Sequence, residues 1–220
     1  PAMSDISSSP QPKPRFYYGW VIVVVVALAG FTQSAETYPV LGVFLKPMTD
    51  EFGWSRSVFA GAMSIGTILG GFLALAVGPL VDRYGPRWIL TIAFTILGAT
   101  LILLGGINSL WQFYALQIIG RVMTMGVIAM AMQVIIPKWF VAKRGRTVAL
   151  GGLGMRTGHT VTPLYVQYLV SNWSWRVATV ATGVVIWAIS LLPVAMFLRR
   201  QPEDLGLLPD GLTREEFERA

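Results

Sequence analysis

Four ionisable side chains lie inside stretches of sequence that are otherwise apolar: Glu36, Arg121, Arg156 and His159. The planar guanidinium of an arginine such as Arg121 matches the geometry of a carboxylate. The imidazole of a histidine such as His159 could carry a coupled proton. Arg156 and His159 are three residues apart, so they share one face of a helix. The fixed charge of the set is net positive, which favours an anionic ligand.

Each of these groups also has a structural explanation. Glu36 can pair with an arginine, and Arg156 and His159 can bond backbone carbonyl groups and so hold helices together. Gln33 and Glu36 belong to the polar stretch Thr32-Gln33-Ser34-Ala35-Glu36-Thr37-Tyr38, which we expect to line an aqueous vestibule. The residues alone leave both explanations open.

Composition identifies the environment in which these charges lie. The 220 residues are 54% hydrophobic, only 13% are charged, and none is cysteine. A soluble domain carries about 25% charged residues. These values exclude a disordered chain, a nucleic-acid-binding arm and a disulfide scaffold. A bilayer core of about 30 Å requires about 20 apolar residues per helix, so we predict an all-α integral membrane protein with six spans.

Apolar runs separated by polar or Pro/Gly clusters predict where these helices lie. We expect them at about 18–45, 57–81, 87–106, 111–136, 147–169 and 176–198. We expect four prolines to fall in the breaks between helices: Pro47, Pro86, Pro137 and Pro202. A charge at the bilayer centre costs roughly 2.5–3.5 kcal/mol. The third and sixth helices carry none, so we expect them to be peripheral.

The ends and loops predict the domain organisation and the orientation. Residues 1–15 are predicted to be a disordered cytoplasmic tail, 16–200 the six-helix unit, and 201–220 the start of a cytoplasmic linker. Lys46, Arg56 and Arg176 fall on the side predicted to be outside. Twelve basic residues fall on the other side: Lys13, Arg15, Arg83, Arg87, Lys138, Lys143, Arg144, Arg146, Arg199, Arg200, Arg214 and Arg219. The positive-inside rule therefore places both termini in the cytoplasm of a cell-membrane protein, and it explains the net charge of +6 without a nucleic-acid partner.

A recognisable motif lies between the second and third helices. The run Gly78-Pro-Leu-Val-Asp82-Arg83-Tyr-Gly85-Pro-Arg87 resembles the G-x-x-x-D-R-x-G-x-R signature of the major facilitator superfamily. The resemblance implies that Gly78, Asp82, Arg83, Gly85 and Arg87 form a conformational latch, in which the aspartate contacts a helix of the opposite half. It also implies that Gly120-Arg121 followed by Gly126 is the family's second motif, whose arginine is often tied to proton coupling.

Further runs are similar to the monocarboxylate and oxalate–formate branch of this superfamily. They are Tyr18-Gly19-Trp20, Phe52-Gly53-Trp54-Ser55-Arg56, Lys138-Trp139-Phe140 with Lys143-Arg144-Gly145-Arg146, and Gln201-Pro202-Glu203-Asp204-Leu205-Gly206-Leu207-Leu208-Pro209-Asp210-Gly211. Two features depart from known members. The animal carriers have a substrate lysine late in helix 1 that is absent from Ala35 to Leu45. The Gly-Pro motif of antiporters in helix 5 is reduced to Pro163.

The superfamily fold has twelve helices, so the resemblance implies that this chain is an N-terminal half built from two inverted three-helix repeats, with a C-terminal half as its partner. The small-residue pairs Gly66-xxx-Gly70 and Gly154-xxx-Gly158 allow helix backbones to approach closely. These glycine faces either pack helices together in the ordinary way or form sliding surfaces between the halves of a moving protein.

The expected function is secondary transport of a small organic anion, a monocarboxylate or dicarboxylate, by alternating access and with possible proton coupling. The alternatives are a drug or other solute efflux carrier, and a non-transporting six-helix sensor or homodimer. An enzyme is not expected, because one histidine, no cysteine and one deep carboxylate supply neither clustered nucleophiles nor metal ligands. No metal or cofactor is expected.

Overall fold

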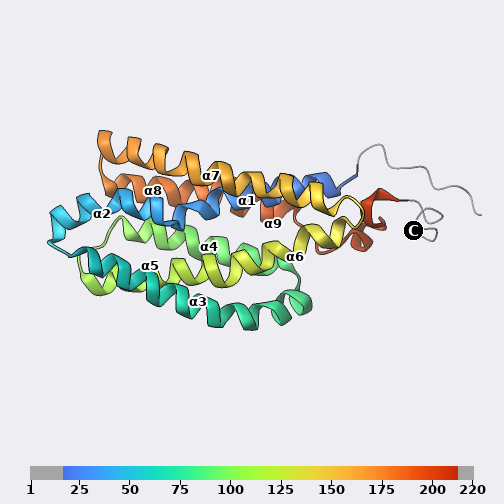
Figure 1. Cartoon of the computed structure of the whole chain (residues 1–220), viewed down its shortest axis with the longest axis horizontal. Helices are drawn as coiled ribbons and strands as arrows, with labels where there is room; N and C mark the ends of the chain where they lie inside the picture. Colours follow the sequence, from blue (N-terminus) through green and yellow to red (C-terminus); the bar gives the residue numbers. More distant parts are fainter. Residues whose placement is uncertain (1–16, 213–220) are drawn as a thin grey trace, which may run out of the picture.

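The computed structural model describes residues 17–212, in which all regular secondary structure is helical. The long helical segments run side by side as a bundle (Figure 1), and they form six spans. Span 1 comprises α1 (Gly19–Gln33), η1 (Ser34–Glu36) and α2 (Tyr38–Phe52). The remaining spans are α3 (Arg56–Tyr84), α4 (Pro86–Leu104), α5–η2–α6 (Leu110–Val122, Met123–Ile128, Ala129–Trp139), α7 (Arg144–Asn172) and α8–η3–α9 (Trp175–Ile186, Trp187–Leu191, Leu192–Phe197).

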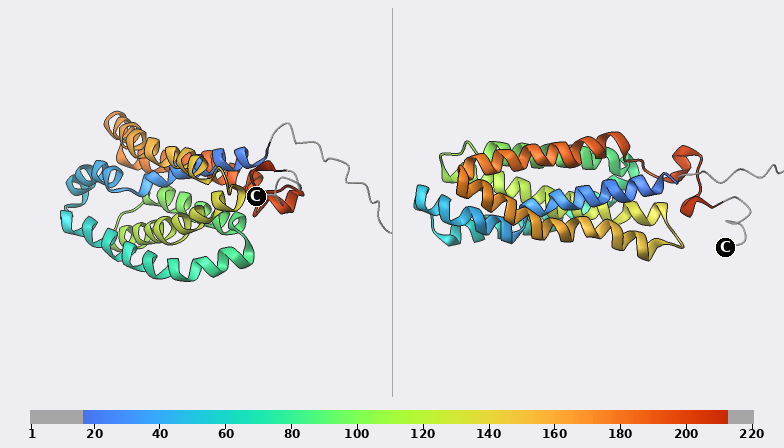
Figure 2. Two further views of the ribbon diagram at one scale, coloured as in Figure 1. Left: turned by 45° about the vertical axis from the view of Figure 1, so that its right-hand side comes forward. Right: turned by 90° about the horizontal axis from the view of Figure 1, so that it is seen from above.

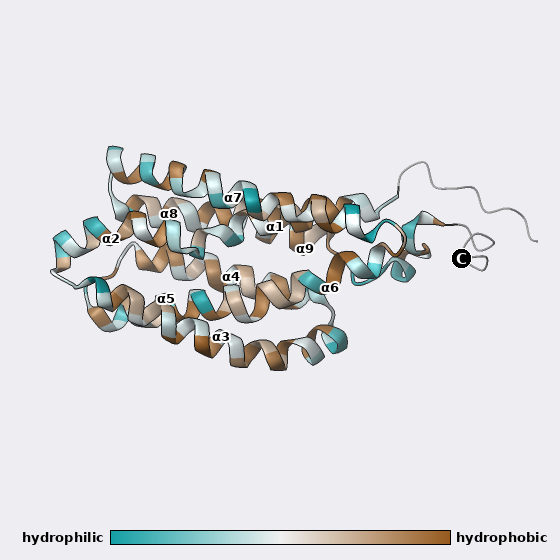
Figure 3. Ribbon diagram, in the orientation of Figure 1, coloured by the Kyte–Doolittle hydropathy of each residue, from teal (hydrophilic) through white to brown (hydrophobic). Residues whose placement is uncertain are grey.

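Length and hydropathy make this bundle a membrane fold. Within residues 17–212, five helical segments are long and apolar enough to cross a bilayer. The sixth, α7, has the same 29-residue length as α3 but is more polar. Brown apolar residues make up much of the helices, and teal ones lie toward the ends of the bundle and at a few positions along α7 and α5 (Figure 3). The predicted all-α, six-helix membrane architecture is confirmed.

Two helix ends differ from the prediction. Pro47 lies inside α2 and Pro137 inside α6, whereas we expected both in breaks. Pro86 and Pro202 do begin helices, α4 and η4 (Pro202–Leu205). An interior proline loses one backbone hydrogen bond. In α2, burial of the neighbouring Met48, which is 0% exposed, offsets that loss and lets the helix continue beyond its apolar core.

The two three-helix repeats pack reciprocally. In the first pairing α1 lies along α7, and in the second α3 lies along α5 and η2, while α4 and α8 meet between the two pairs (Figures 1 and 2). Glycines make each approach possible. A Cβ on Gly154 would overlap the carbonyl oxygen of Ala27, and one on Gly66 would lie 2.7 Å from the Cβ of Arg121. Both small-residue pairs are therefore helix contacts within this bundle.

Spans 1 and 4, which are the first helices of the two repeats, are both irregular at mid-depth. Span 1 changes to a 3₁₀ turn at Ser34–Glu36 and to extended backbone at Thr37 before α2 begins. Span 4 contains the π-helical turn η2. Such interruptions at membrane depth are tolerated where the backbone is buried in protein or lines a cavity. They place the polar stretch of span 1 beside span 4.

The two ends of the bundle differ in charge. Residues 17 and 212 lie at one end, which we call the terminal end (Figure 1). Within the described residues, this end carries eight of the twelve basic side chains counted above: Arg83, Arg87, Lys138, Lys143, Arg144, Arg146, Arg199 and Arg200. The opposite end carries Lys46, Arg56 and Arg176. The predicted disordered tail, 1–15, lies outside the described residues.

Candidate functional site

Two of the predicted site residues meet in the interior of the bundle. Glu36 is 4% exposed and Arg121 is 3% exposed. The Arg121 guanidinium donates from Nη1 to the backbone carbonyl oxygen of Glu36 and from Nε to the Thr67 hydroxyl, 3.1 Å away. It also lies 5.0 Å from the ring centroid of Tyr38. Arg121 thus joins the break in span 1 to α3 and α5.

The carboxylate of Glu36 has a different partner. Its Oε2 accepts a hydrogen bond from Gln117 Nε2 at 2.8 Å, one helical turn before Arg121. Within residues 17–212, the ion pairs do not include one between Arg121 and this carboxylate. A Cβ on Gly120 would lie 3.1 Å from Glu36 Oε1, so this glycine allows the carboxylate to approach α5. Arg121 therefore carries its charge among neutral hydrogen-bond acceptors.

Gln33 connects this cluster to a cavity. Its side chain is 4% exposed, and its Nε2 donates to the carbonyl oxygen of Thr124 in η2 at 3.2 Å. Gln33 also lines a cavity of about 420 Å³ between α1, α6 and α7. The polar side chains of the cavity wall are Gln33, Gln133 and Arg144. Apolar residues such as Met132 and Met155 form most of the remainder, and no acidic side chain of the described chain lines it.

Arg156 and His159 lie elsewhere. Both side chains are exposed on α7, and within residues 17–212 neither makes a hydrogen bond or an ion pair. The backbone carbonyl oxygen of Arg156 accepts from the Thr160 hydroxyl at 3.4 Å, within the same helix. No such contact brings them to Arg121 or Glu36. Met155, which lines the cavity, immediately precedes Arg156 in the helix. The five predicted site residues thus fall into two groups. Glu36, Arg121 and the adjoining Gln33 form a buried cluster, and Arg156 and His159 form an exposed pair on α7.

The latch motif forms the α3–α4 turn at the terminal end. Asp82 accepts from Lys138 Nζ at 3.1 Å, and its backbone carbonyl accepts from Arg200. Arg87 Nε donates to the carbonyl oxygen of Ala195 at 2.8 Å. Gly85 has φ +81°, a left-handed conformation that favours glycine. The turn therefore contacts both span 4 and span 6 of this chain.

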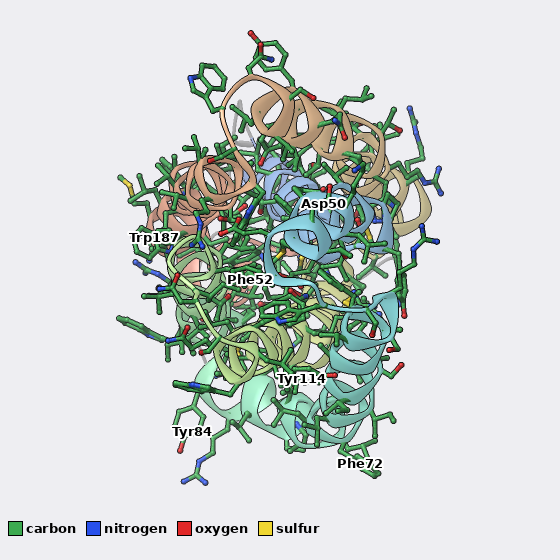
Figure 4. The ribbon with its side chains drawn as sticks, turned by 90° about the vertical axis from the view of Figure 1, so that its left-hand side faces the viewer. Asp50, Phe52, Phe72, Tyr84, Tyr114 and Trp187 are labelled. Atoms are coloured by element: carbon green, nitrogen blue, oxygen red, sulfur yellow. The ribbon has the colours of Figure 1, made fainter. Side chains whose placement is uncertain are left out.

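The two remaining latch residues make few contacts. A Cβ on Gly78 would meet nothing within 4 Å. The guanidinium of Arg83 lies 5.4 Å from the ring of its neighbour Tyr84, and both side chains are exposed. Figure 4 shows the bundle from the end opposite the termini, with Tyr84 and Phe72 pointing outward from α3. These residues lie on the outer surface of this chain.

Aromatic and charged side chains close the end away from the termini. Phe52 and Trp54 stack with ring centroids 4.4 Å apart, and Phe52 lies near the axis of the bundle in Figure 4. The Glu51 carboxylate accepts from Trp175 Nε1 at 2.6 Å and from Arg176 Nη2 at 2.7 Å. These bonds join span 1 to span 6. Lys46 and Asp50 form a separate, exposed i,i+4 pair.

Some residues of the site were not predicted. Gln117 and Thr67 contact the Glu36–Arg121 cluster, yet neither is ionised at neutral pH, and a single polar residue of this kind is common in an apolar helix. Tyr38, which also contacts Arg121, belongs to the polar stretch that was predicted. Gln117 lies four residues before Arg121, so the helical repeat could have placed both on one face. Thr67 has no such signal, because it reaches Arg121 from another helix.

Comparisons with known proteins agree with this architecture. The chain matches the model of the Major Facilitator Superfamily over residues 19–218. It is 31% identical over 94 residues to the 4-hydroxybenzoate transporter PcaK of Pseudomonas aeruginosa, covering 43% of this chain and 21% of that protein. It is 29% identical over 155 residues to the probable anion transporter 4, chloroplastic, of Arabidopsis thaliana, covering 69% of this chain and 28% of that protein.

The matched segments thus span 21% and 28% of the lengths of these curated relatives. The family match covers far more of this chain and includes all six helical spans. This chain belongs to the Major Facilitator Superfamily.

Proposed function

We propose that this chain forms the N-terminal six-helix half of a secondary transporter that moves a small organic anion, a monocarboxylate or dicarboxylate, by alternating access. One observation carries the proposal. The cavity of about 420 Å³ between α1, α6 and α7 is lined by two amides, Gln33 and Gln133, and by the cation Arg144, without an acidic side chain. An apolar wall with a few convergent polar groups is typical of small-molecule sites, and this set of groups favours a carboxylate.

The relatives support the same substrate class. One is named for the carboxylate 4-hydroxybenzoate and another for anions. The finer resemblance to the monocarboxylate and oxalate–formate branch is part of this proposal and rests on the sequence runs quoted above. A C-terminal half of the same transporter would supply the facing wall of the cavity.

The charge asymmetry supports an orientation. In the proposed topology the terminal end, with its eight basic side chains, faces the cytoplasm, and the end with three faces outward. Both termini are then cytoplasmic in a multi-pass cell-membrane protein.

The mechanism assigns distinct roles to the two groups of charges. Arg156 and His159 face the second half or water, because an unpaired charge facing lipid is costly. They help to bind the anion, and His159 carries a coupled proton. Glu36 and Arg121 hold spans 1, 2 and 4 together around the cavity and respond to the substrate through Gln33. The latch turn stabilises one end state, and the substrate drives the change only by binding the two end states unequally.

The test is uptake of radiolabelled 4-hydroxybenzoate, lactate and oxalate into proteoliposomes that contain the full-length protein. At least one of these carboxylates should accumulate, and an inward proton gradient should increase its uptake. Arg144→Gln, which removes the cation of the cavity wall, and Arg156→Gln and His159→Gln should each reduce uptake about tenfold, equivalent to about 1.4 kcal/mol. His159→Gln should also remove the pH dependence.

Arg146→Gln is the matched control, because Arg146 is exposed on the same helix at the terminal end. It should leave uptake unchanged. Failure to transport any organic anion would refute the proposal. Unchanged uptake and pH dependence in Arg156→Gln, His159→Gln and Arg121→Ala would refute the assigned site.

A further inference from the structure

The carboxylate of Asp210 is bound by three consecutive backbone amides of the loop between α6 and α7. Its Oδ2 accepts from Val141 N at 2.9 Å and from Ala142 N at 2.6 Å, and its Oδ1 accepts from Lys143 N at 3.1 Å. Asp210 is 7% exposed. Its backbone has φ +60°, in the left-handed region, and no other non-glycine residue among residues 17–212 has a positive φ. Both carboxylate oxygens accept hydrogen bonds, and the strained backbone is held in place by the surrounding structure, so this contact is a specific feature of the fold.

The segment that carries Asp210 crosses the terminal end of the bundle (Figure 2). We call residues 199–212 the strap. Near its start, Arg200 donates to the backbone carbonyl oxygen of Asp82 in the α3–α4 turn. Near its end, Gly211 has φ +68°, and a Cβ there would lie 3.1 Å from the ring of Tyr17, just before α1. The strap thus contacts three separate parts of this end.

Tyr17 completes the contact between the strap and α6. Its hydroxyl donates to the carbonyl oxygen of Trp139, the last residue of α6, at 2.7 Å. Its ring packs edge-on against Phe140, with centroids 5.4 Å apart. Asp210 and Tyr17 therefore hold both sides of the loop that leads from α6 into α7.

This loop determines where the cavity-lining part of α7 begins. Lys143 is the N-cap residue of α7, and the first helical residue, Arg144, lines the cavity. The three amides lie in the turn that immediately precedes α7, and the last of them belongs to the N-cap residue. Successive backbone amides of such a turn form a concave anion-binding site, so the carboxylate fixes the backbone that leads into the helix. The Asp210 contact therefore fixes the backbone immediately before Arg144, the one cation that the described residues contribute to the cavity wall.

We propose that Asp210 is a positioning residue for the transport cavity: through the strap it fixes the start of α7 and holds Arg144 in the cavity wall. In consequence, residues up to 212 act as part of the six-helix unit, and any linker begins after them rather than at residue 201. The effect on transport rests on the proposed function, whereas the effect on the loop does not.

Trypsin provides a direct measure of the loop, because Lys143 and Arg144 are its cleavage sites. Both are exposed, yet cleavage requires the backbone to open locally. The experiment is limited trypsinolysis of the purified full-length protein, with cleavage after Lys143 or Arg144 followed by mass spectrometry. Asp210→Ala should increase the cleavage rate about tenfold, because three hydrogen bonds to a charged acceptor are lost. Asp210→Asn keeps one acceptor oxygen and should give an intermediate rate.

Asp204→Ala is the matched control, since Asp204 is an exposed acidic residue of the same strap. Trypsin should cleave this variant at the same rate as the unaltered protein. In proteoliposomes, Asp210→Asn should raise the KM for 4-hydroxybenzoate several-fold and leave the limiting rate nearly unchanged. A purely structural defect would instead lower the amount of active protein and hence the limiting rate.

Each result has a separate meaning. If Asp210→Ala and Asp210→Asn are cleaved no faster than Asp204→Ala, the strap does not hold the loop and the inference is wrong. If Asp210→Ala fails to fold, Asp210→Asn decides by the same criterion. Faster cleavage with an unchanged KM would refute the positioning role. Absence of anion uptake in the unaltered protein would refute the proposed function. The cleavage rates would then still decide whether the strap holds the loop between α6 and α7.

Discussion

The guanidinium of Arg121 donates a hydrogen bond to the backbone carbonyl of Glu36, at the point where the first span is broken. A helix that stops inside a bilayer leaves carbonyl groups without intrahelical partners, and no water is available to bind them. The arginine of span 4 therefore acts as a C-cap for the first part of span 1. This contact gives a structural reason for a buried charge that is independent of any ligand.

The first prediction concerns this cap. Arg121→Leu leaves the Glu36 carbonyl and the Thr67 hydroxyl without a donor and the buried Glu36 without its nearby cation, so it should destabilise the protein by about 3–5 kcal/mol. Arg121→Lys should cost less, because one ammonium can satisfy one of the two acceptors. The measurement is the melting temperature of the purified full-length protein. Arg146→Leu, at an exposed position, is the control, and an equal melting temperature for Arg121→Leu would contradict the capping role.

The second prediction uses the glycines of α7. A Cβ at Gly154 would overlap the Ala27 carbonyl oxygen, so Gly154→Ala should force α1 and α7 apart and cost about 1–3 kcal/mol or more. Gly152 has nothing within 4 Å of the same position, and Gly152→Ala should be neutral or stabilising by about 0.5–1 kcal/mol. Melting temperatures of the two variants compare them directly. Gly66→Ala and Gly71→Ala should repeat the contrast in α3, and no difference within either pair would show that close packing is not required.

Much of the fold could be predicted, because membrane insertion depends on local hydropathy. The six spans and their order follow from apolar runs, and the close contacts at Gly66 and Gly154 follow from small-residue spacing. The family likewise follows from the ten-residue run that ends at Arg87, since that run is continuous in the sequence. Each of these signals lies within one continuous stretch of the sequence.

The contacts that were missed join distant segments. The sequence indicated that Glu36 can pair with an arginine but gave no reason for a bond from the Arg121 guanidinium to its backbone carbonyl, because a helix break produces no hydropathy signal. Pro47 was misassigned because proline usually ends a helix, and the compensating burial of Met48 depends on tertiary packing. Asp210 was seen only as part of a motif, since its three amide partners lie 67–69 residues away.

The third prediction concerns alkaline pH. Burial, together with the negative charges of Asp210 and Glu203, raises the pKa of Tyr17 above its ordinary value. The folded state therefore keeps this proton when the unfolded state has lost it, so the stability contributed by Tyr17 is present below about pH 10 and is lost as the pH rises further. Tyr17→Phe should lower the melting temperature slightly at pH 9, because the bond to Trp139 is lost. Between pH 9 and pH 11 the melting temperature of this variant should fall less steeply than that of the unaltered protein. Tyr84 is exposed, so Tyr84→Phe should leave the dependence of melting temperature on pH unchanged. If Tyr17→Phe also left it unchanged, Tyr17 would not be the group responsible.

The fourth prediction separates a conformational role of the latch turn from a structural one. The Lys138–Asp82 pair is partly exposed, with 32% and 72% of the two side chains accessible, and such pairs contribute about 0–1 kcal/mol. Asp82→Asn should therefore shift the melting temperature by no more than a few degrees. If the pair stabilises one end state of the transport cycle, however, uptake should fall about tenfold, because the cycle depends on the balance between its states.

Asp50→Asn is the matched control for Asp82→Asn, since Asp50 also pairs with a lysine in an exposed position, at the opposite end of the bundle. It should change neither melting temperature nor uptake. Lys138→Gln should reproduce the effect of Asp82→Asn, and the double variant should be no worse than either single one, because both remove the same contact. Additive losses in the double variant would show that Asp82 acts through another partner, and uptake equal to that of Asp50→Asn would remove the latch from the mechanism.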